Sequence, residues 1–353
     1  MPDTEVCPLT FKGGIALNNL LEVKELHISF HTHGGKIQAV RGVNFDLSPG
    51  EAIAIVGESG CGKSVTAQAI MGLIPDPPGR IERGKIFFQG LDLTSMPEDG
   101  MEKVRGREIS MIFQDPMTAL NPTMTIGKQI TEGWALGRKI SRRNAEKKAI
   151  EMLNLVGLPY PEKRVKQYPH ECSGGMRQRV MIAMALAGAP KLLIADEPTT
   201  ALDVTIQAQI MELMKEIKNQ TGTSIILITH DLGVVAGMAS RILVMYAGKI
   251  VESGSVREVF FQARHPYTWA LLKSVPRLDE MKKQRLASIG GQPPDLFKPP
   301  GGCAFAPRCP YGMVICREKE PQFVQLAYQR GVACWLEHPQ APSVEKGATA
   351  HGK

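Results

Sequence analysis

The sequence predicts an α/β fold in which helices cover a parallel β-sheet, and three features of the chain carry this prediction. Glu51–Val56 is a short, nearly all-apolar run, as expected of a strand buried on both faces of a sheet. A glycine-rich loop and then a helix-forming segment follow it directly. From residue 174 onward, short aliphatic runs alternate with helical segments, a pattern typical of parallel sheets.

The first part of the chain is expected to add an antiparallel β subdomain at the edge of this sheet. Residues 1–20 are dotted with glycine, asparagine and proline, which indicates an irregular N-terminal extension. Leu21–Phe30 alternates in hydrophobicity and predicts one strand. Gln38–Leu47 predicts a second, which enters a turn at Pro49 and Gly50. The helix after the glycine-rich loop is expected from Lys63 to about residue 73.

A helical insertion is predicted at about residues 117–170, which are rich in Lys, Arg, Glu, Leu and Met. Beyond it we expect helices at 174–188, 204–220 and 232–239. Strands are expected between them at 192–195, 225–229 and 242–246. The helix at 204–220 has one apolar face, marked by Ile206, Ile210, Leu213 and Ile217.

Composition limits the setting in which the chain works. Its net charge of +7 suits a nucleotide, a polyanion or an acidic membrane surface, but the basic residues are scattered and select none of these. The longest apolar run, Val180–Ala189, is shorter than the roughly 20 residues that a membrane span needs. The N-terminus carries Asp3 and Glu5 and lacks the pattern of a secretory signal. We therefore expect a cytoplasmic protein that reaches a membrane only through a partner.

The glycine-rich loop has the residue pattern of a triphosphate-binding site. In such a loop the backbone N–H groups converge on phosphate oxygens, and the dipole of the following helix assists them. Lys63 would contact the β- and γ-phosphates, and Ser64 would ligate Mg²⁺. An accidental glycine-rich turn is the alternative, and the complete motif between a buried strand and a helix makes it improbable. The residues assigned to binding are Gly57, Glu58, Ser59, Gly60, Cys61, Gly62, Lys63, Ser64 and Val65.

Two carboxylates follow the aliphatic run at 192–195 and supply the second half of a phosphoryl-transfer site. Asp196 would hold the Mg²⁺ shell, and Glu197 would polarise the attacking water. An acidic pair at a helix N-terminus is the common structural alternative. Together with the phosphate loop, the catalytic interpretation is favoured.

Further motifs resemble those of ATP-binding cassette (ABC) ATPases. Residues 172–179 resemble the signature segment, residues 200–203 the D-loop, and Gln114 and His230 the Q-loop and switch residues. The resemblance spans about residues 21–254 and implies a P-loop nucleoside-triphosphatase core. It further implies Gln114 as a Mg²⁺ ligand, His230 at the γ-phosphate, and a second cassette packed head to tail. The signature residues acting on the other cassette would be Ser173, Gly174, Gly175 and Met176, with Asp203 in the D-loop.

Two positions depart from the pattern of that family. Met176 stands where glutamine is usual, although the serine and both glycines that would contact phosphate are present. The family stacks adenine on an aromatic residue upstream of the phosphate loop, and the corresponding position falls near His33 and Gly34. Phe30 and His33 are the candidates, and a plain core position is an equal alternative for Phe30.

The remaining features resemble the oligopeptide/dipeptide (and nickel) importer branch of this family. They are Phe113–Thr123, His265–Leu272 and a cysteine-containing tail. The branch implies ATP-driven import of di- and oligopeptides with a related but different partner ATPase, two integral-membrane permeases and an extracytoplasmic peptide-binding protein. The chain would lie at the cytoplasmic face of the inner membrane, and Gln114–Tyr168 would receive the permeases. Nickel or oligosaccharide import remains an alternative.

Other classes of function are disfavoured. A soluble cassette ATPase acting on nucleic acid or ribosomes would suit the basic charge. However, the chain has a single cassette and no long heptad insertion, so no nucleic-acid partner is expected. A nucleotide-binding scaffold without turnover is disfavoured by Glu197 and His230. The expected organisation is a cassette at 21–275, a Pro/Gly-rich linker at 276–302, a Cys-rich extension at 303–340 and a flexible tail at 341–353.

Four of the seven cysteines crowd into the C-terminal extension, which points to metal binding in a reducing compartment. They lack the paired C-x2–4-C spacing usual in structural zinc sites. The importer branch implies a [4Fe–4S] cluster on these residues, with zinc as the second interpretation and free thiols as the third. The residues concerned are Cys303, Cys309, Cys316 and Cys334.

Overall fold

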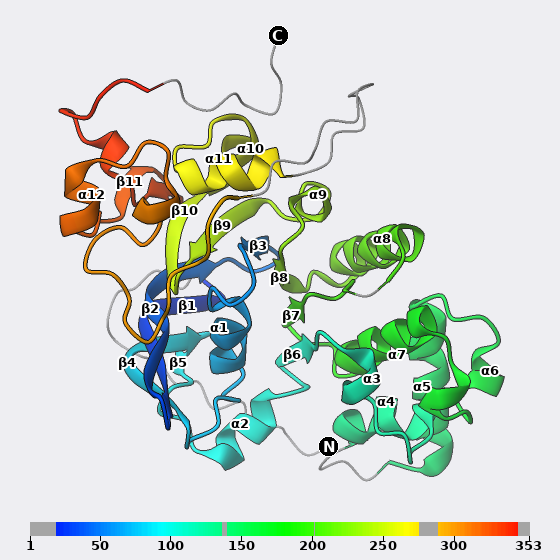
Figure 1. Ribbon diagram of the computed structural model, residues 1–353. Coiled ribbons are helices and arrows are strands. Elements are labelled where there is room, and N and C mark those ends of the chain that lie inside the picture. The colour runs from blue at the N-terminus through cyan, green and yellow to red at the C-terminus, as the bar shows by residue number, and fades with distance from the viewer. Residues whose placement is uncertain (1–18, 136–139, 201, 275–288, 345–353) are drawn as a thin grey trace, which may run out of the picture.

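The computed structural model describes residues 19–135, 140–200, 202–274 and 289–344. The expectations for residues 1–18, 276–288 and 345–353 lie outside the described residues. Within these ranges the chain has an α/β fold with one mainly parallel sheet, one antiparallel sheet and a lobe of helices (Figure 1). The predicted fold class is therefore confirmed.

The larger sheet has the strand order β11-β12-β10-β9-β3-β8-β7-β6. Every residue of its parallel strands is buried, because both faces of the sheet are covered. Along β3, alternate side chains enter two different cores, with Ala54 in one and Ile53 and Ile55 in the other. The parallel strands are β3 (Ala52–Val56), β6 (Ile109–Ile112), β7 (Leu192–Asp196), β8 (Ser224–Thr229) and β9 (Arg241–Tyr246).

The smaller sheet is antiparallel and has the order β2-β1-β4-β5. Together with α1 (Lys63–Ile70) it covers one face of the larger sheet, and its apolar residues share a core with Ile226 and Ile228. Its strands are β1 (Leu21–Thr32), β2 (Gly35–Leu47), β4 (Gly79–Phe88) and β5 (Leu91–Asp92). β4 was not predicted, because its residues 79–85 are mostly polar, charged or glycine and show no strand pattern.

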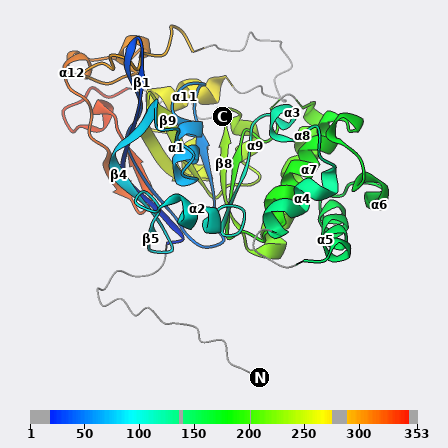
Figure 2. The same ribbon diagram turned by 90° about the horizontal axis from the view of Figure 1, so that it is seen from below.

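Short helices between residues 116 and 186 gather into one lobe beside the sheet (Figure 2). The helical character expected for about 117–170 is thus observed. Ser141 caps α5 by accepting a hydrogen bond from the Asn144 N–H. The helices are α3 (Pro116–Ala119), α4 (Ile126–Ala135), α5 (Arg142–Leu155), α6 (Pro161–Arg164), η1 (Pro169–Glu171) and α7 (Gly174–Leu186).

Aspartate side chains cap two further helices that follow sheet strands. Asp203 caps α8 (Val204–Thr221), and Asp231 caps α9 (Leu232–Val235). The apolar face of α8 is buried at Ile210 and Ile217. α9 is shorter than the helix expected at 232–239, because residues 236–238 form a turn instead. A short helix that the sequence did not indicate, α2 (Glu98–Val104), precedes β6.

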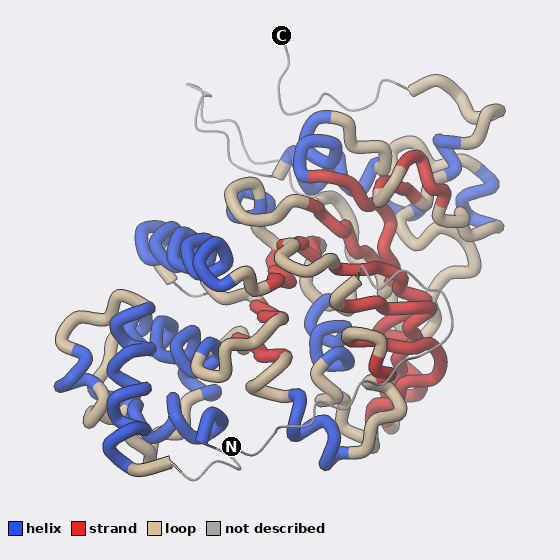
Figure 3. Tube along the Cα trace, turned by 180° about the vertical axis from the view of Figure 1, so that it is seen from behind, coloured by secondary structure: helices blue, strands red, loops and turns tan. Residues whose placement is uncertain are grey.

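The C-terminal part of the chain continues the larger sheet (Figure 3). β12 (Arg330–Val332) pairs with β10 (Lys249–Ser255), and β11 (Val324–Ala327) pairs with β12, all antiparallel. The sequence indicates an appendage after a linker and carries no signal for this strand pairing. The helices here are α10 (Val256–Phe261), α11 (Pro266–Lys273), η2 (Ala306–Arg308), α12 (Val314–Glu318) and η3 (Trp335–Glu337).

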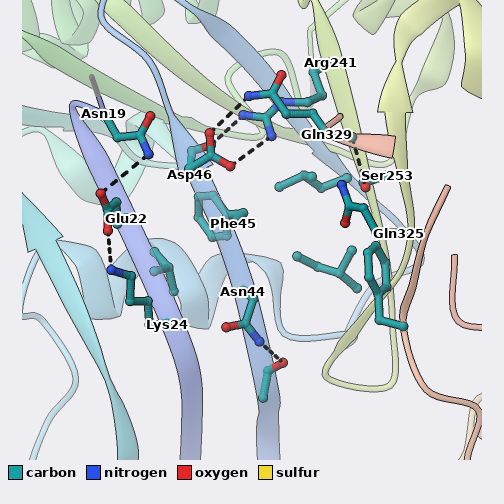
Figure 4. Close-up of a pocket in the computed structure, with 15 residues that line it drawn as sticks. Asn19, Glu22, Lys24, Asn44, Phe45, Asp46, Arg241, Ser253, Gln325 and Gln329 are labelled. Carbon is teal, nitrogen blue, oxygen red and sulfur yellow. Dashed lines mark hydrogen bonds and ion pairs between the residues drawn. The ribbon is translucent and has the colours of Figure 1, made fainter. Parts of the chain in front are cut away.

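A cavity of about 440 Å³ lies where this extension meets the antiparallel sheet (Figure 4). Asp46 accepts hydrogen bonds across it from Arg241 and Gln329. None of the residues assigned to the nucleotide site lines this cavity. Among the described residues, no helix combines the length and apolarity that crossing a membrane requires.

Candidate nucleotide site

The phosphate loop connects β3 to α1, as the motif predicts. Gly57 and Gly62 have φ values of 156° and 100°. A Cβ atom at Gly57 would lie 2.2 Å from the Met245 carbonyl oxygen, and one at Gly62 would lie 2.4 Å from that of Ala39. Only glycine therefore fits at these two positions. The N-cap residue of α1 is Gly62, which has no side chain to accept hydrogen bonds from the first N–H groups of the helix.

Lys63 is buried inside the loop. Its Nζ donates hydrogen bonds to the carbonyl oxygens of Gly57 at 2.8 Å and Glu58 at 3.0 Å. The Cys61 sulfur lies 3.9 Å from the same nitrogen, and burial raises the pKa of this thiol. Of the other loop residues, Ser59 and Gly60 are exposed. Val65, in α1, packs against the core that contains Ile53 and Ile55.

Ser64, the last residue of the phosphate-loop motif, contacts Asp196 at the end of β7. The Ser64 hydroxyl donates to Asp196 Oδ1 at 2.9 Å. Burial raises the pKa of Asp196, and the hydrogen bond from Ser64 opposes that effect. A hydroxyl and a carboxylate in contact are the hard oxygen ligands that Mg²⁺ prefers.

Glu197 is the centre of a polar cluster formed at the carboxyl ends of three neighbouring strands. Its carboxylate accepts from Gln114 Nε2 at 3.0 Å, contacts His230 Nδ1 at 3.2 Å and accepts from the Thr200 hydroxyl at 2.9 Å. Gln114 follows β6, Glu197 follows β7 and His230 follows β8. Parallel strands end at the same edge of a sheet, which explains why residues so distant in sequence converge.

The backbone of Glu197 is itself unusual. Its φ of 47° lies in the left-handed region, which costs a non-glycine residue about 1–3 kcal/mol and is typical of functional sites. The contact from Thr200 was not foreseen, because the sequence assigned this residue only to the D-loop. Asp203 of the D-loop lies at the start of α8, where it accepts from the Ile206 N–H at 2.9 Å.

The signature segment begins α7, inside the helical lobe. Ser173 caps this helix by accepting from the Met176 N–H at 3.4 Å. A Cβ atom at Gly175 would lie 3.1 Å from the Ile206 side chain. Figures 1 and 2 show α7 separated by the central strands from α1, which carries the phosphate loop. The phosphate loop and the signature segment thus lie at different places in the fold.

The adenine candidates lie in and beside the β1–β2 turn. His33 is exposed in the turn, whereas Phe30 packs against the core that contains Ile53 and Ile55. The sequence did not indicate a third ring, Phe297, which lies against Gly34 and Gly35. The Gln38 N–H donates to the Leu296 carbonyl at 2.9 Å and fixes this segment beside the turn.

The four C-terminal cysteines are not joined by disulfides and lie in partly or fully buried positions. The Cys303 N–H donates to the Cys316 carbonyl at 2.7 Å. Burial raises the pKa of Cys303 to about 11 and that of Cys334 to about 12, and the neighbouring thiols add to both shifts. Within the part of the chain that the structure describes, no three His, Cys, Asp or Glu side chains form a group that would hold a single metal ion.

Comparison with known proteins gives two family matches. Residues 40–200 match the family described as ABC transporter. Residues 251–316 match the family described as oligopeptide/dipeptide transporter, C-terminal region. Among solved structures, the ATP-binding cassette MJ0796, a dimer in a post-hydrolysis state bound to ADP and Pi, is similar. Its TM-score is 0.61 at 28% identity, covering 67% of this chain and 99% of that one.

Curated relatives align over almost the whole chain. The oligopeptide transport ATP-binding protein OppD of Bacillus subtilis (strain 168) is 62% identical, covering 94% of this chain and 92% of its own length. The dipeptide transport ATP-binding protein DppD of the same organism is 56% identical, covering 92% of this chain and 97% of its own length. The fold and the polar cluster define a P-loop ATPase. The chain belongs to the ABC transporter family, as its motifs had predicted.

Proposed function

We propose that this ATPase energises the import of di- and oligopeptides across the cytoplasmic membrane. The observation that carries the ATPase role is the convergence of Gln114, Glu197 and His230 beside the Ser64–Asp196 pair. The peptide substrate is supported by the match of residues 251–316 and by the peptide transport named for both relatives.

In this proposal each residue of the site has one role. The loop from Gly57 to Val65 holds the triphosphate, and Lys63 transfers its hydrogen bonds from loop carbonyls to phosphate oxygens. Mg²⁺, held by Ser64, Asp196 and Gln114, neutralises charge on the phosphates. Glu197 orients and polarises the attacking water, and His230 contacts the γ-phosphate. Thr200 keeps the Glu197 carboxylate in place through its hydroxyl.

Transport requires partners that complete and use the site. The two separate anion-binding loops support pairing with a second cassette, so that Ser173, Gly174, Gly175 and Met176 act on nucleotide held by the partner. The partner is a related but different chain. This chain would lie at the cytoplasmic face of the inner membrane, where two integral-membrane permeases would contact its helical lobe. An extracytoplasmic binding protein would deliver the peptide. ATP shifts the permeases because it binds the closed pair more tightly than the open one.

The substrate is tested by uptake in cells that carry or lack the gene for this chain. Labelled di- and oligopeptides are offered in parallel with nickel and an oligosaccharide. Loss of peptide uptake alone is the expected result. Loss of nickel or oligosaccharide uptake with peptide uptake intact would replace the proposed substrate, and a soluble ATPase stimulated by nucleic acid would argue against transport altogether.

We further propose that adenine lies at the β1–β2 turn, between His33 and the ring of Phe297. The proximity of Phe297 to two glycines supports this, since it places an aromatic ring beside a turn that itself lacks a Phe, Tyr or Trp. Each stacking ring is worth about 1–3 kcal/mol. Phe297→Ala should therefore weaken ATP binding about tenfold or more, with Phe323→Ala on the same extension as control. Equal affinities for all three proteins would exclude this role.

A [4Fe–4S] cluster held by the four C-terminal cysteines is also part of the proposal. Such a cluster takes one thiolate at each iron, so its ligands stand further apart than the ligands of one zinc ion. The hydrogen bond from the Cys303 N–H to the Cys316 carbonyl supports the proximity of these cysteines, while the lack of a compact three-ligand group among the described residues disfavours zinc. Metal binding would displace the thiol protons and stabilise the fold of a segment that has only a small hydrophobic core of its own.

Metal analysis separates the three interpretations of these cysteines. Chain purified without oxygen should be brown and carry about four irons with equal sulfide. Cys309→Ser should lower the iron content sharply, whereas Cys172→Ser, a buried cysteine of the helical lobe, should leave it unchanged. A colourless chain with zinc would establish the second interpretation, and a metal-free chain the third.

A further inference from the structure

The C-terminal extension reaches the phosphate loop through one arginine. Arg308 ends the short helix η2, and its side chain is only 3% exposed. Its guanidinium donates two parallel hydrogen bonds to the Glu58 carboxylate, from Nη1 to Oε2 at 2.6 Å and from Nη2 to Oε1 at 2.8 Å. Glu58 is the second residue of the phosphate loop. The ion pair therefore connects segments 250 residues apart.

The remaining donors of Arg308 are fixed as well. Nη1 also donates to the Tyr246 hydroxyl at 3.1 Å, and Nε and Nη2 donate to the carbonyls of Gly290 and Ile289 at 2.9 and 3.2 Å. Because these hydrogen bonds already fix the guanidinium, pairing with Glu58 costs little further conformational entropy. Lysine cannot form the same bidentate contact with a carboxylate. This pair differs from an exposed surface salt bridge, which contributes little.

Glu58 is held at two further points. Its N–H donates to the Tyr267 hydroxyl at 2.8 Å, and its carbonyl accepts from Lys63 Nζ at 3.0 Å. Tyr267 belongs to α11, and its ring lies 4.5 Å from that of Tyr246 and 5.3 Å from that of Phe305, centre to centre. The residues that clamp Glu58 thus come from the phosphate loop itself and from the C-terminal part of the chain.

The negative charge of Glu58 would disfavour nucleotide binding if no cation neutralised it. A carboxylate one residue after Gly57 places negative charge beside the loop that must accept a triphosphate. Unless it is neutralised, it opposes nucleotide binding through Coulomb repulsion. We propose that Arg308 is a positioning residue for nucleotide binding, which neutralises Glu58 and fixes the shape of the phosphate loop. The extension is then part of the nucleotide site, whatever solute is carried and whatever metal the cysteines hold.

A double substitution tests this role in the full-length chain. Arg308→Ala should weaken MgATP binding at least about tenfold, because it leaves an unpaired carboxylate beside the phosphates. Adding Glu58→Gln to that variant should recover most of the lost affinity, since the amide carries no charge. High salt should shrink the defect of Arg308→Ala through screening. Equilibrium binding of a fluorescent ATP analogue gives all of these values.

A matched control removes a different ion pair across the same interface. Glu320 of the extension pairs with Arg41 and Lys249, and Glu320→Gln should leave ATP affinity at the wild-type value. If Arg308→Ala fails to fold, Arg308→Lys retains the charge without the fork and should bind ATP with intermediate affinity. Wild-type ATP affinity in either Arg308 variant would overturn the proposal. So would a double variant as weak as Arg308→Ala, which would indicate a merely structural contact.

Discussion

Glu197→Gln should abolish ATP turnover and leave ATP binding intact. The amide keeps the size of the side chain and can still contact Gln114 and Thr200, but it cannot accept a proton from water. General-base groups contribute about 10²–10⁴-fold, so the turnover number should fall by at least two orders of magnitude. The measurement is phosphate release from the assembled transporter at saturating MgATP, beside equilibrium ATP binding to the same variant.

The control for this prediction is a carboxylate that lies outside the site. Glu108 lies near the start of β7 and pairs with Lys191, so Glu108→Gln should hydrolyse ATP at the wild-type rate. Wild-type phosphate release by Glu197→Gln would remove this residue from catalysis. Joint loss of binding and turnover would instead indicate that the substitution disturbs the strained loop around Glu197.

Lys63→Ala should lose both nucleotide binding and turnover. The ammonium is buried between the carbonyls of Gly57 and Glu58, and it is the charge nearest to the phosphates in the proposed complex. A hydrogen bond to a charged group contributes about 1.5–3 kcal/mol, so ATP affinity should fall roughly 10- to 100-fold. A titration of MgATP against the full-length chain measures it, and circular dichroism checks that the fold is retained.

Substitution at an exposed lysine gives the comparison for Lys63. Lys24 lies on β1, pairs with Glu22 at the surface and is distant in sequence from the loop. Lys24→Ala should bind ATP as the wild type does. ATP affinity for Lys63→Ala equal to that of Lys24→Ala would show that this ammonium does not hold phosphate.

The sequence predicted the site residues best where they form contiguous motifs. Gly57–Ser64 forms a contiguous motif whose glycines are required by backbone geometry, and Asp196 and Glu197 directly follow a buried strand. Four of the parallel strands, β3, β7, β8 and β9, were visible because burial on both faces makes them continuous apolar runs. The fifth, β6, has only four residues and was not predicted. The convergence of Gln114, Glu197 and His230 then follows from the common edge at which parallel strands end.

Contacts between distant segments could not be predicted from the sequence. β12 has only three residues and pairs with β10 across a stretch of 74 intervening residues, so it carries no periodic signal. Arg308 and Glu58 belong to different motifs, and neither motif indicates the other. Phe297 lies in a proline-rich segment that predicts a linker, and its position beside the β1–β2 turn depends on contacts with Gly34 and Gly35 and on the Gln38–Leu296 hydrogen bond.

The central claim is that cleavage of ATP at Glu197 drives solute import. It is tested most directly by labelled-peptide uptake in cells whose only copy of this chain is either wild type or Glu197→Gln, at equal membrane content of the two proteins. The account predicts uptake with the wild-type chain and only background with Glu197→Gln. Equal uptake with both chains would contradict it.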